Sequence, residues 1–378
     1  MQIKQVKARS IKDSRGNPTI EVSVNSQKAS APAGKSIGKA ETPPYKISLK
    51  QSIKDINSLN FSGIKINSFK DLSLIESKIK EQFKLKDVKK FGANALVSLE
   101  IAILKALAKE KNLQLYQIIN PKSHHLPIPV GNAVGGGLHS HNKNSPNFQE
   151  FLLIPNKKTI NENIAEMNKV YNLLEQILRT KQKNDEGAWQ TSFSDEQILR
   201  ILSKQEIRIG LDIAPSSFFK NGFYNYKIKS LNTSSQIFYI NYLIKKYSLF
   251  YIEDPLNEDD FESFSKIIRS DKNLVVGDDL TATQISRLKK AIADKSINAT
   301  IIKPNQNGSL LELEKIFQLC KKHKIKTILS HRSGETLDTA LADLAVGFGA
   351  DFIKCGISTK WREVKLKRLI EIEKIIKK

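Results

Sequence analysis

Residues 330–336, which read Ser-His-Arg-Ser-Gly-Glu-Thr, place an imidazole, a guanidinium and three hydroxyl groups directly after an apolar run. Arg332 can bind a phosphate or a carboxylate bidentately, Ser333 can donate a hydrogen bond beside it, and His331 can exchange a proton. The segment therefore suits a phosphorylated substrate better than a neutral one. Taken alone, it is equally well explained as a strand-to-helix turn whose hydroxyl groups cap the next helix.

Short apolar runs that end in a charged residue recur along the chain, and each resembles a buried strand. Five of them end in Asp212, Glu253, Asp278, Lys303 and Lys354, and His331 follows a sixth. From Glu253 onward the gaps between them hold helical patterns, such as residues 309–323. This alternation predicts a parallel sheet closed as a (β/α)8-type barrel, in which the polar carboxyl ends of the strands form the active site.

The length of 378 residues suits such a barrel together with a smaller domain. Cys320 and Cys355 have neither a disulfide framework nor metal-ligand spacing, which fits a reducing cytosol. No apolar run reaches membrane-spanning length, and the first residues lack the apolar core of a signal peptide. The sequence therefore predicts a cytoplasmic protein without a membrane partner.

The chain is strongly basic, since 61 Lys and Arg against 39 Asp and Glu give a net charge of +22. Such an excess could attract nucleic acid or acidic membrane surfaces, or steer an anionic substrate. The lysines are scattered along the chain and form no recognisable nucleic-acid module. A solvated surface is therefore favoured over a nucleic-acid site.

The first hundred residues have a different pattern, typical of a small α+β domain. Residues 4–11 and 19–24 alternate like half-buried strands, and helical patterns follow over 72–83 and 94–111. Between them, Ser36 lies in a Gly-containing loop that lacks the full nucleotide-binding pattern, so we expect a lid, with an ordinary surface loop as the alternative. Prolines after residue 120 disfavour further helix, which predicts domains at 1–121 and 122–378.

Two further segments bring polar groups toward the predicted barrel rim. Gln149 and Glu150 precede an apolar run, so Glu150 reaches the same rim if that strand is antiparallel to its predecessor. His139 ends a glycine-rich segment, and Glu186 offers a carboxylate in a loop.

Eight short motifs occur in the order found in the enolase family, and the resemblance covers nearly the whole chain. They are Asp13-Ser-Arg-Gly-Asn-Pro-Thr19, Gly92-Ala-Asn-Ala95, Gln149-Glu-Phe151, Asp185-Glu-Gly187, Ile252-Glu-Asp-Pro255, Gly277-Asp-Asp-Leu-Thr281, Asn305-Gln306 and Ser330-His-Arg-Ser-Gly-Glu-Thr336. The resemblance implies an amino-terminal capping domain and a barrel that begins β-β-α-α. It also implies the reversible, Mg²⁺-dependent dehydration of 2-phosphoglycerate to phosphoenolpyruvate, a step of glycolysis and gluconeogenesis.

The resemblance further implies a role for each matching residue. Asp212, Glu253 and Asp278 correspond to the tight Mg²⁺ site, and Ser36 to a ligand of a second Mg²⁺ that binds with the substrate. Lys303 corresponds to the general base and Glu186 to the general acid. Substrate contacts are implied for His139, Gln149, Glu150, His331, Arg332, Ser333 and Lys354.

These residue types suit the implied reaction. Removing a proton from the carbon beside a carboxylate creates extra negative charge, which two Mg²⁺ ions can neutralise. A cationic setting lowers the pKa of a lysine enough for it to act as a base. A protonated Glu186 can then donate to the departing hydroxyl on the opposite face.

The chain departs from the family pattern without losing a catalytic group. Ala188 stands where the family has a glycine, Pro304 follows the implied base, and Lys360-Trp-Arg-Glu363 replaces Arg-Ser-Glu-Arg. An active, shortened enzyme is therefore predicted. Two alternatives are a related enzyme that acts on another carboxylate and a non-catalytic relative with a binding role.

A symmetric homodimer, or a higher homo-oligomer, is also implied, with Glu21 near the interface. Glu371 stands where the family has an arginine that pairs with this glutamate. Because like charges repel, we expect the dimer to be less firmly held than usual.

Overall fold

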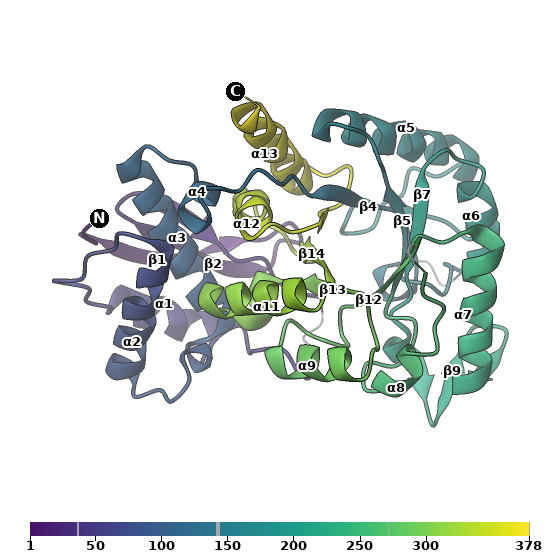
Figure 1. Ribbon diagram of the computed structural model, residues 1–378, viewed down its shortest axis with the longest axis horizontal. Coiled ribbons are helices and arrows are strands. Elements are labelled where there is room, and N and C mark those ends of the chain that lie inside the picture. Colours follow the sequence, from purple (N-terminus) through teal and green to yellow (C-terminus); the bar gives the residue numbers. More distant parts are fainter. Residues whose placement is uncertain (36–37, 141–143, 271, 378) are drawn as a thin grey trace.

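The computed structural model describes residues 1–35, 38–140, 144–270 and 272–377, except for the side chain of His139. Figure 1 shows a small α+β domain at one end of the molecule and a barrel ringed by helices in the remainder. Ser36 and the His139 side chain lie outside the described part, so their roles stay predictions.

The amino-terminal domain contains an antiparallel sheet in the order β1 (Val6–Lys12), β2 (Pro18–Val24) and β3 (Gln27–Ser30). Four helices accompany this sheet: α1 (Leu49–Asn57), α2 (Leu72–Phe83), α3 (Ala93–Lys111) and α4 (Leu115–Ile119). Helix α3 is buried along most of its length because it packs on β2 and β3 on one side and meets the barrel on the other. The predicted strands and helices of this domain are confirmed.

The larger sheet closes into a barrel because its last strand pairs in parallel with its first. In order around the barrel the strands are β4 (Ile128–Gly135), β5 (Glu150–Ile154), β7 (Arg208–Asp212), β11 (Tyr251–Glu253), β12 (Leu274–Gly277), β13 (Ala299–Ile302), β14 (Lys326–Ser330) and β15 (Phe352–Lys354). A short strand, β6 (Trp189–Gln190), extends the sheet beside β4. The fold class expected from the sequence is confirmed.

The barrel begins with the irregularity that the resemblance implied. Strand β5 is antiparallel to both of its neighbours, and α5 (Ile160–Leu178) and α6 (Asp195–Leu202) follow before β7. In this register Glu150 lies opposite Asp212. Glu150, the first residue of its strand, therefore reaches the same rim as the last residues of the parallel strands.

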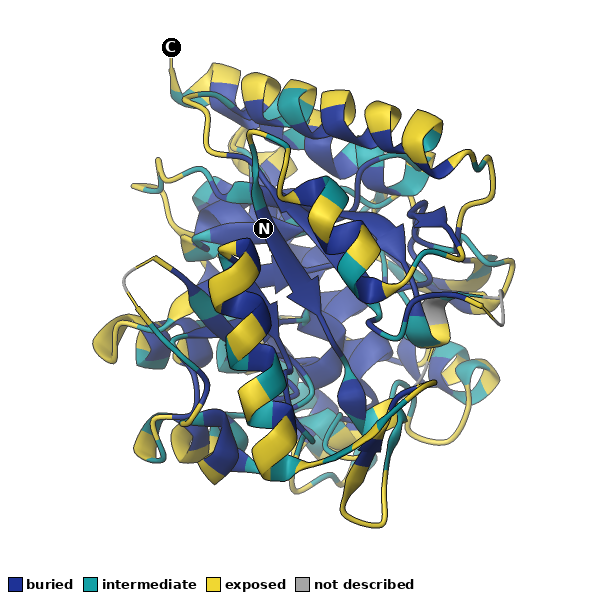
Figure 2. Cartoon of the chain, turned by 90° about the vertical axis from the view of Figure 1, so that its right-hand side faces the viewer, coloured by how far each residue is buried: buried dark blue, intermediate teal, exposed yellow. Residues whose placement is uncertain are grey.

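Helices cover the outside of the barrel, and most of them bury one face and expose the other, as Figure 2 shows. After the first two, they are α7 (Thr233–Tyr247), α8 (Phe261–Phe264), α9 (Ile285–Ala293), α10 (Pro304–Asn307), α11 (Leu310–Lys322), α12 (Ala340–Phe348) and α13 (Lys360–Ile376). A small antiparallel sheet of β8 (Phe219–Lys220), β9 (Phe223–Asn225) and β10 (Ser230–Asn232) precedes α7.

Apolar side chains fill the barrel interior. One buried cluster takes residues from the barrel strands, among them Val130, Leu152, Tyr251, Ile301 and Ile328. Burial of each large apolar side chain stabilises the fold by about 1.5–3 kcal/mol, so the interior is a packed core and no channel. The functional groups are therefore confined to the rim.

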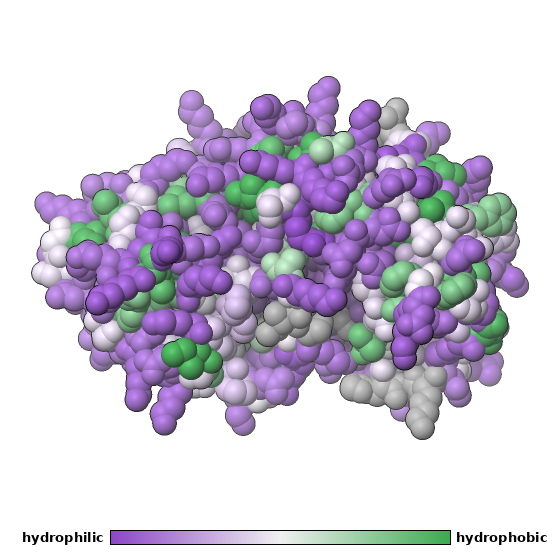
Figure 3. All heavy atoms as spheres, turned by 90° about the horizontal axis from the view of Figure 1, so that it is seen from below, coloured by the Kyte–Doolittle hydropathy of each residue, from purple (hydrophilic) through white to green (hydrophobic). Residues whose placement is uncertain are grey.

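The surface is largely hydrophilic on the face shown in Figure 3, which agrees with lysines spread over the whole chain. Within the described ranges, we find no helix that is both long and apolar enough to cross a bilayer. Cys320 and Cys355 are buried free thiols.

Candidate active site

The polar ends of the barrel strands line a single cavity of about 330 Å³, to which both domains contribute. Gly34, Lys35 and Glu41 of the amino-terminal domain form one side of it. The predicted site residues on its wall are Gln149, Glu150, Glu186, Asp212, Asp278, Lys303, His331, Arg332, Ser333 and Lys354. Seven segments of the barrel thus converge on this cavity.

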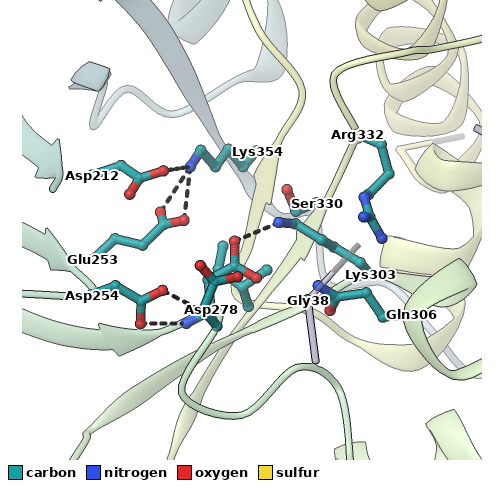
Figure 4. Close-up of polar contacts among 12 residues, drawn as sticks. Gly38, Asp212, Glu253, Asp254, Asp278, Lys303, Gln306, Ser330, Arg332 and Lys354 are labelled. Carbon is teal, nitrogen blue, oxygen red and sulfur yellow. Dashed lines mark hydrogen bonds and ion pairs between the residues drawn. The ribbon is translucent and has the colours of Figure 1, made fainter. Parts of the chain in front are cut away.

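Lys354, the last residue of β15, lies at the centre of the first cluster of side chains. Its Nζ is 2.8 Å from Glu150 Oε2, 3.1 Å from Asp212 Oδ2 and 2.8 Å from Glu253 Oε2, and Figure 4 shows two of these carboxylates around the amine. Burial opposes the charge, but the three carboxylates raise the pKa of Lys354 well above its ordinary value. Lys354 is therefore a charged group that holds three strand ends together.

Lys303 and Asp278 form a second cluster through an ion pair between the ends of β12 and β13. Burial lowers the pKa of Lys303 and Asp278 raises it, and the net result is a pKa above the ordinary value. The positive charges of Arg332 and Lys354 lower the pKa of Lys303. Lys303 is accordingly protonated in this arrangement.

Two aspartates that the sequence analysis passed over lie beside Asp278. One oxygen each of Asp254, Asp278 and Asp279 lies within 4.8 Å of the other two. Asp254 accepts hydrogen bonds from the backbone N–H groups of Asp278 and Asp279, at 3.0 and 2.7 Å. Burial and the neighbouring carboxylates raise the pKa of Asp279 to about 7. The doubled acidic residues in the two motifs were the signal that could have revealed this group.

The predicted ligands Asp212, Glu253 and Asp278 are joined by lysines in this structure. Lys354 binds the first two and Lys303 the third. Carboxylates this close require positive charge nearby, and the two ammonium groups supply it. Gln149 also reaches this cluster, since its Nε2 donates to Asp212 Oδ2 at 3.3 Å.

Glu186 and His331 meet on another side of the cavity, and both are buried. His331 Nε2 lies 3.6 Å from Glu186 Oε2, and Asn132 Nδ2 donates to the same oxygen at 3.3 Å. Asn184 Oδ1 holds the Glu186 loop by accepting from the backbone N–H groups of Glu186 and Ala188. The replacement of a family glycine by Ala188 therefore leaves the turn intact.

Pro304, the second departure near the site, occupies the first position of α10. Proline is favoured there because its fixed φ suits a helix start and no hydrogen bond is lost. The substitution is thus compatible with Lys303 at the end of β13.

Arg332 and Ser333, the predicted anion-binding residues, contact the amino-terminal domain. Arg332 Nη1 lies 2.8 Å from Glu41 Oε2, and both side chains are buried. Arg15 Nη1 donates to Ser333 Oγ at 3.3 Å, and the backbone of Gly334 pairs with Ala33. No local pattern in the sequence indicates a role for Glu41 or Arg15, because their partners lie far away in the chain.

Comparison with known protein families accounts for nearly the whole chain. Residues 3–119 match the family described as the enolase N-terminal domain, and residues 123–378 match the enolase C-terminal TIM barrel domain. The chain belongs to the enolase family. Members of this family are lyases, so the chain is assigned to that enzyme class.

Full-length relatives of the family are similar to this chain, and the three named here come from archaea. The enolase of Picrophilus torridus is 36% identical over 98% of both chains. The enolase of Archaeoglobus fulgidus is 35% identical over 100% of this chain and 98% of its own. That of Sulfurisphaera tokodaii is 36% identical over 98% of this chain and 95% of its own. These names favour an enolase over the two alternatives, which were a related enzyme that acts on another carboxylate and a non-catalytic relative.

Proposed function

We propose that this member of the enolase family catalyses the reversible dehydration of 2-phosphoglycerate to phosphoenolpyruvate in glycolysis and gluconeogenesis. The observation that carries the proposal is one cavity that combines a lysine, a carboxylic acid and an anion-binding arginine on a matching full-length fold. The dehydration of a phosphorylated carboxylate requires a base, a proton donor and a group that binds the phosphate, and these three residue types can supply them. We propose the cytoplasm as its location, since this reaction is a step of glycolysis.

The carboxylates of the site fit Mg²⁺, which prefers oxygen ligands in an octahedral shell. Asp278 Oδ1 is buried and has no hydrogen-bond partner among the described residues, as expected of an oxygen that binds a cation. Asp212, Glu253 and Asp278 would hold the first ion, and Ser36 would help hold a second that binds with substrate. Bound Mg²⁺ supplies positive charge that stabilises the negative charge developing on the substrate carboxylate.

The residues of the chain divide the remaining work between binding and proton transfer. Arg332 and Ser333 bind the phosphate, and Lys354 supports the carboxylate end of the substrate. Lys303 removes the proton beside the carboxylate, and Glu186 donates a proton to the departing hydroxyl. We infer that His139, Gln149, Glu150 and His331 complete the substrate contacts.

We also propose that the chain divides into an amino-terminal capping domain, residues 1–121, and a barrel domain, residues 122–378. The separate antiparallel sheet and the two family matches, over 3–119 and 123–378, support this division. Since Gly34, Lys35 and Glu41 line the cavity, the capping domain takes part in the site.

The decisive experiment is a direct assay of phosphoenolpyruvate formation from 2-phosphoglycerate, with and without Mg²⁺. We expect activity only with the cation. Mandelate, an amino-acid substrate of ammonia lyases and 3-phosphoglycerate serve as alternative substrates on the same preparation. Turnover of one of these without turnover of 2-phosphoglycerate would contradict the proposal, as would a folded, Mg²⁺-loaded protein that turns over none.

A further inference from the structure

Arg362, in the first turn of α13, is a fully buried arginine behind the cavity wall. It lies within the segment that departs from the family pattern, where the sequence analysis expected no functional group. Gly356 leaves space for it, because a Cβ at that position would come 2.4 Å from Arg362 Cδ. The local backbone is thus arranged around this side chain.

The guanidinium of Arg362 donates five hydrogen bonds, as many as it has N–H groups. Nε donates to His331 Nδ1 at 2.9 Å. The other bonds run from Nη1 to Asp185 O at 3.3 Å and Thr359 Oγ1 at 3.2 Å, and from Nη2 to Arg332 O at 3.2 Å and Ser333 O at 3.1 Å. One side chain therefore ties the loop before Glu186 to the turn that carries His331.

The bond from Arg362 decides where His331 carries its proton. A guanidinium stays protonated in proteins, so its Nε can only donate and His331 Nδ1 can only accept. Burial, with a contribution from the charge of Arg362, holds the pKa of His331 well below its ordinary value, so the ring is neutral. The ring proton consequently sits on Nε2, the atom that lies 3.6 Å from Glu186 Oε2.

We propose that Arg362 is a positioning residue for the proton donor. It fixes His331 as the Nε2–H tautomer, which faces Glu186, and it holds the Glu186 loop through the carbonyl of Asp185. This inference rests on the proposed function, in which Glu186 donates to the departing hydroxyl. None of the hydrogen bonds of Arg362 reaches Lys303, so we expect the loss of Arg362 to slow the second proton transfer more than the first.

The tautomer can be measured without any turnover, by ¹⁵N NMR of the histidine rings. The chain has six histidines, and His331→Asn identifies the signal. We expect a ring protonated at Nε2 alone in the parent protein, and proton occupancy at Nδ1 in Arg362→Met. Arg368→Met is the matched control, because it removes another arginine of α13 whose partners are Asp343, Gln114 and Glu371. An unchanged His331 signal in Arg362→Met would overturn the proposal.

A second measurement compares dehydration with exchange of the α-proton in deuterated solvent, both at saturating substrate. In Arg362→Met we expect dehydration to fall at least about tenfold more than exchange, while Arg368→Met keeps the parental ratio. Equal losses of both rates would show a merely structural role. A parent protein that neither dehydrates nor exchanges would refute the proposed function, and the tautomer would still be decided by NMR.

Arg362→Gln covers the case in which Arg362→Met does not fold. Glutamine keeps a polar group, but its amide has an oxygen that can accept from His331 Nδ1 as well as an N–H group that can donate to it, so it no longer restricts Nδ1 to accepting. The same direction of change is therefore expected in both measurements, and a parental tautomer with a parental rate ratio in this variant would also overturn the proposal.

Discussion

Lys303 and Glu186 reach the cavity from separate segments, one at the end of β13 and the other in the loop before β6. Their surroundings differ in kind. Lys303 is surrounded by charged groups, whereas Glu186 contacts an amide and a neutral imidazole. Because the two side chains are held independently, the two proton transfers can be separated by mutation.

Lys303→Ala should lose both product formation and exchange of the α-proton with deuterated solvent, since no other group is placed to remove that proton. Glu186→Gln should block dehydration and retain exchange. Each loss is expected to be about a hundredfold or more. Lys303→Ala that exchanges at the parental rate would show that the base is misassigned, with Lys354 the next residue to test.

Excess chelator should abolish activity, and Asp278→Ala should do the same with the fold preserved, because the loss of one carboxylate weakens the cation site. Circular dichroism checks the fold. Asp351→Asn is the control: this aspartate pairs with Lys326 away from the cavity, so the variant should retain activity and its sensitivity to chelator. Full activity in excess chelator would contradict the prediction.

Much of this site could be predicted because five of the parallel barrel strands change from apolar to charged residues at their ends, as at Asp212 and Lys354. No local sequence pattern indicates a side chain whose partner lies far away in the chain. Glu41 meets Arg332 through a contact between domains. Arg362 lies in a lysine-rich helix that has the composition of a solvated face, yet it is fully buried.

At the scale of elements, α3 and α11 join the two domains through a buried carboxyl. Glu100 Oε2 accepts a hydrogen bond at 2.7 Å from the backbone N–H of Leu310, the first residue of α11. Burial, with Glu76 nearby, raises the pKa of Glu100 well above its ordinary value. The carboxyl therefore binds its proton more tightly in the folded protein than in the unfolded chain.

This difference gives the stability a predictable pH dependence. A pKa that is higher in the folded state makes the free energy of unfolding fall as the pH rises above the unfolded-state value of about 4.3. Glu100→Gln keeps the acceptor for Leu310 and removes the titration. Urea unfolding at pH 5 and pH 8 should show the variant gaining stability relative to the parent at the higher pH. A difference that is the same at both values would contradict this.

At the scale of the whole molecule, we expect a homodimer in solution. The repulsion expected between Glu21 and Glu371 is reduced, since Arg9 binds the first at 2.7 Å and Arg368 the second at 3.1 Å within the chain. Light scattering should give about twice the chain mass of 42.6 kDa at micromolar concentration. A mass equal to that of one chain would refute the prediction.

The closure of the barrel through β15 and β4 has a consequence for synthesis on the ribosome. The pairing of Phe352 with Ile128 joins two strands that lie 224 residues apart in the chain. Such distant pairing delays folding, and edges that stay open are prone to aggregate. The nascent barrel therefore keeps two unpaired strand edges until β15 leaves the exit tunnel. Lys354, the last residue of β15, joins the site in the same step. A stalled or truncated chain that stops before β15 would lack both the closed fold and the lysine that joins its carboxylates, and it should become a substrate for chaperones and proteases.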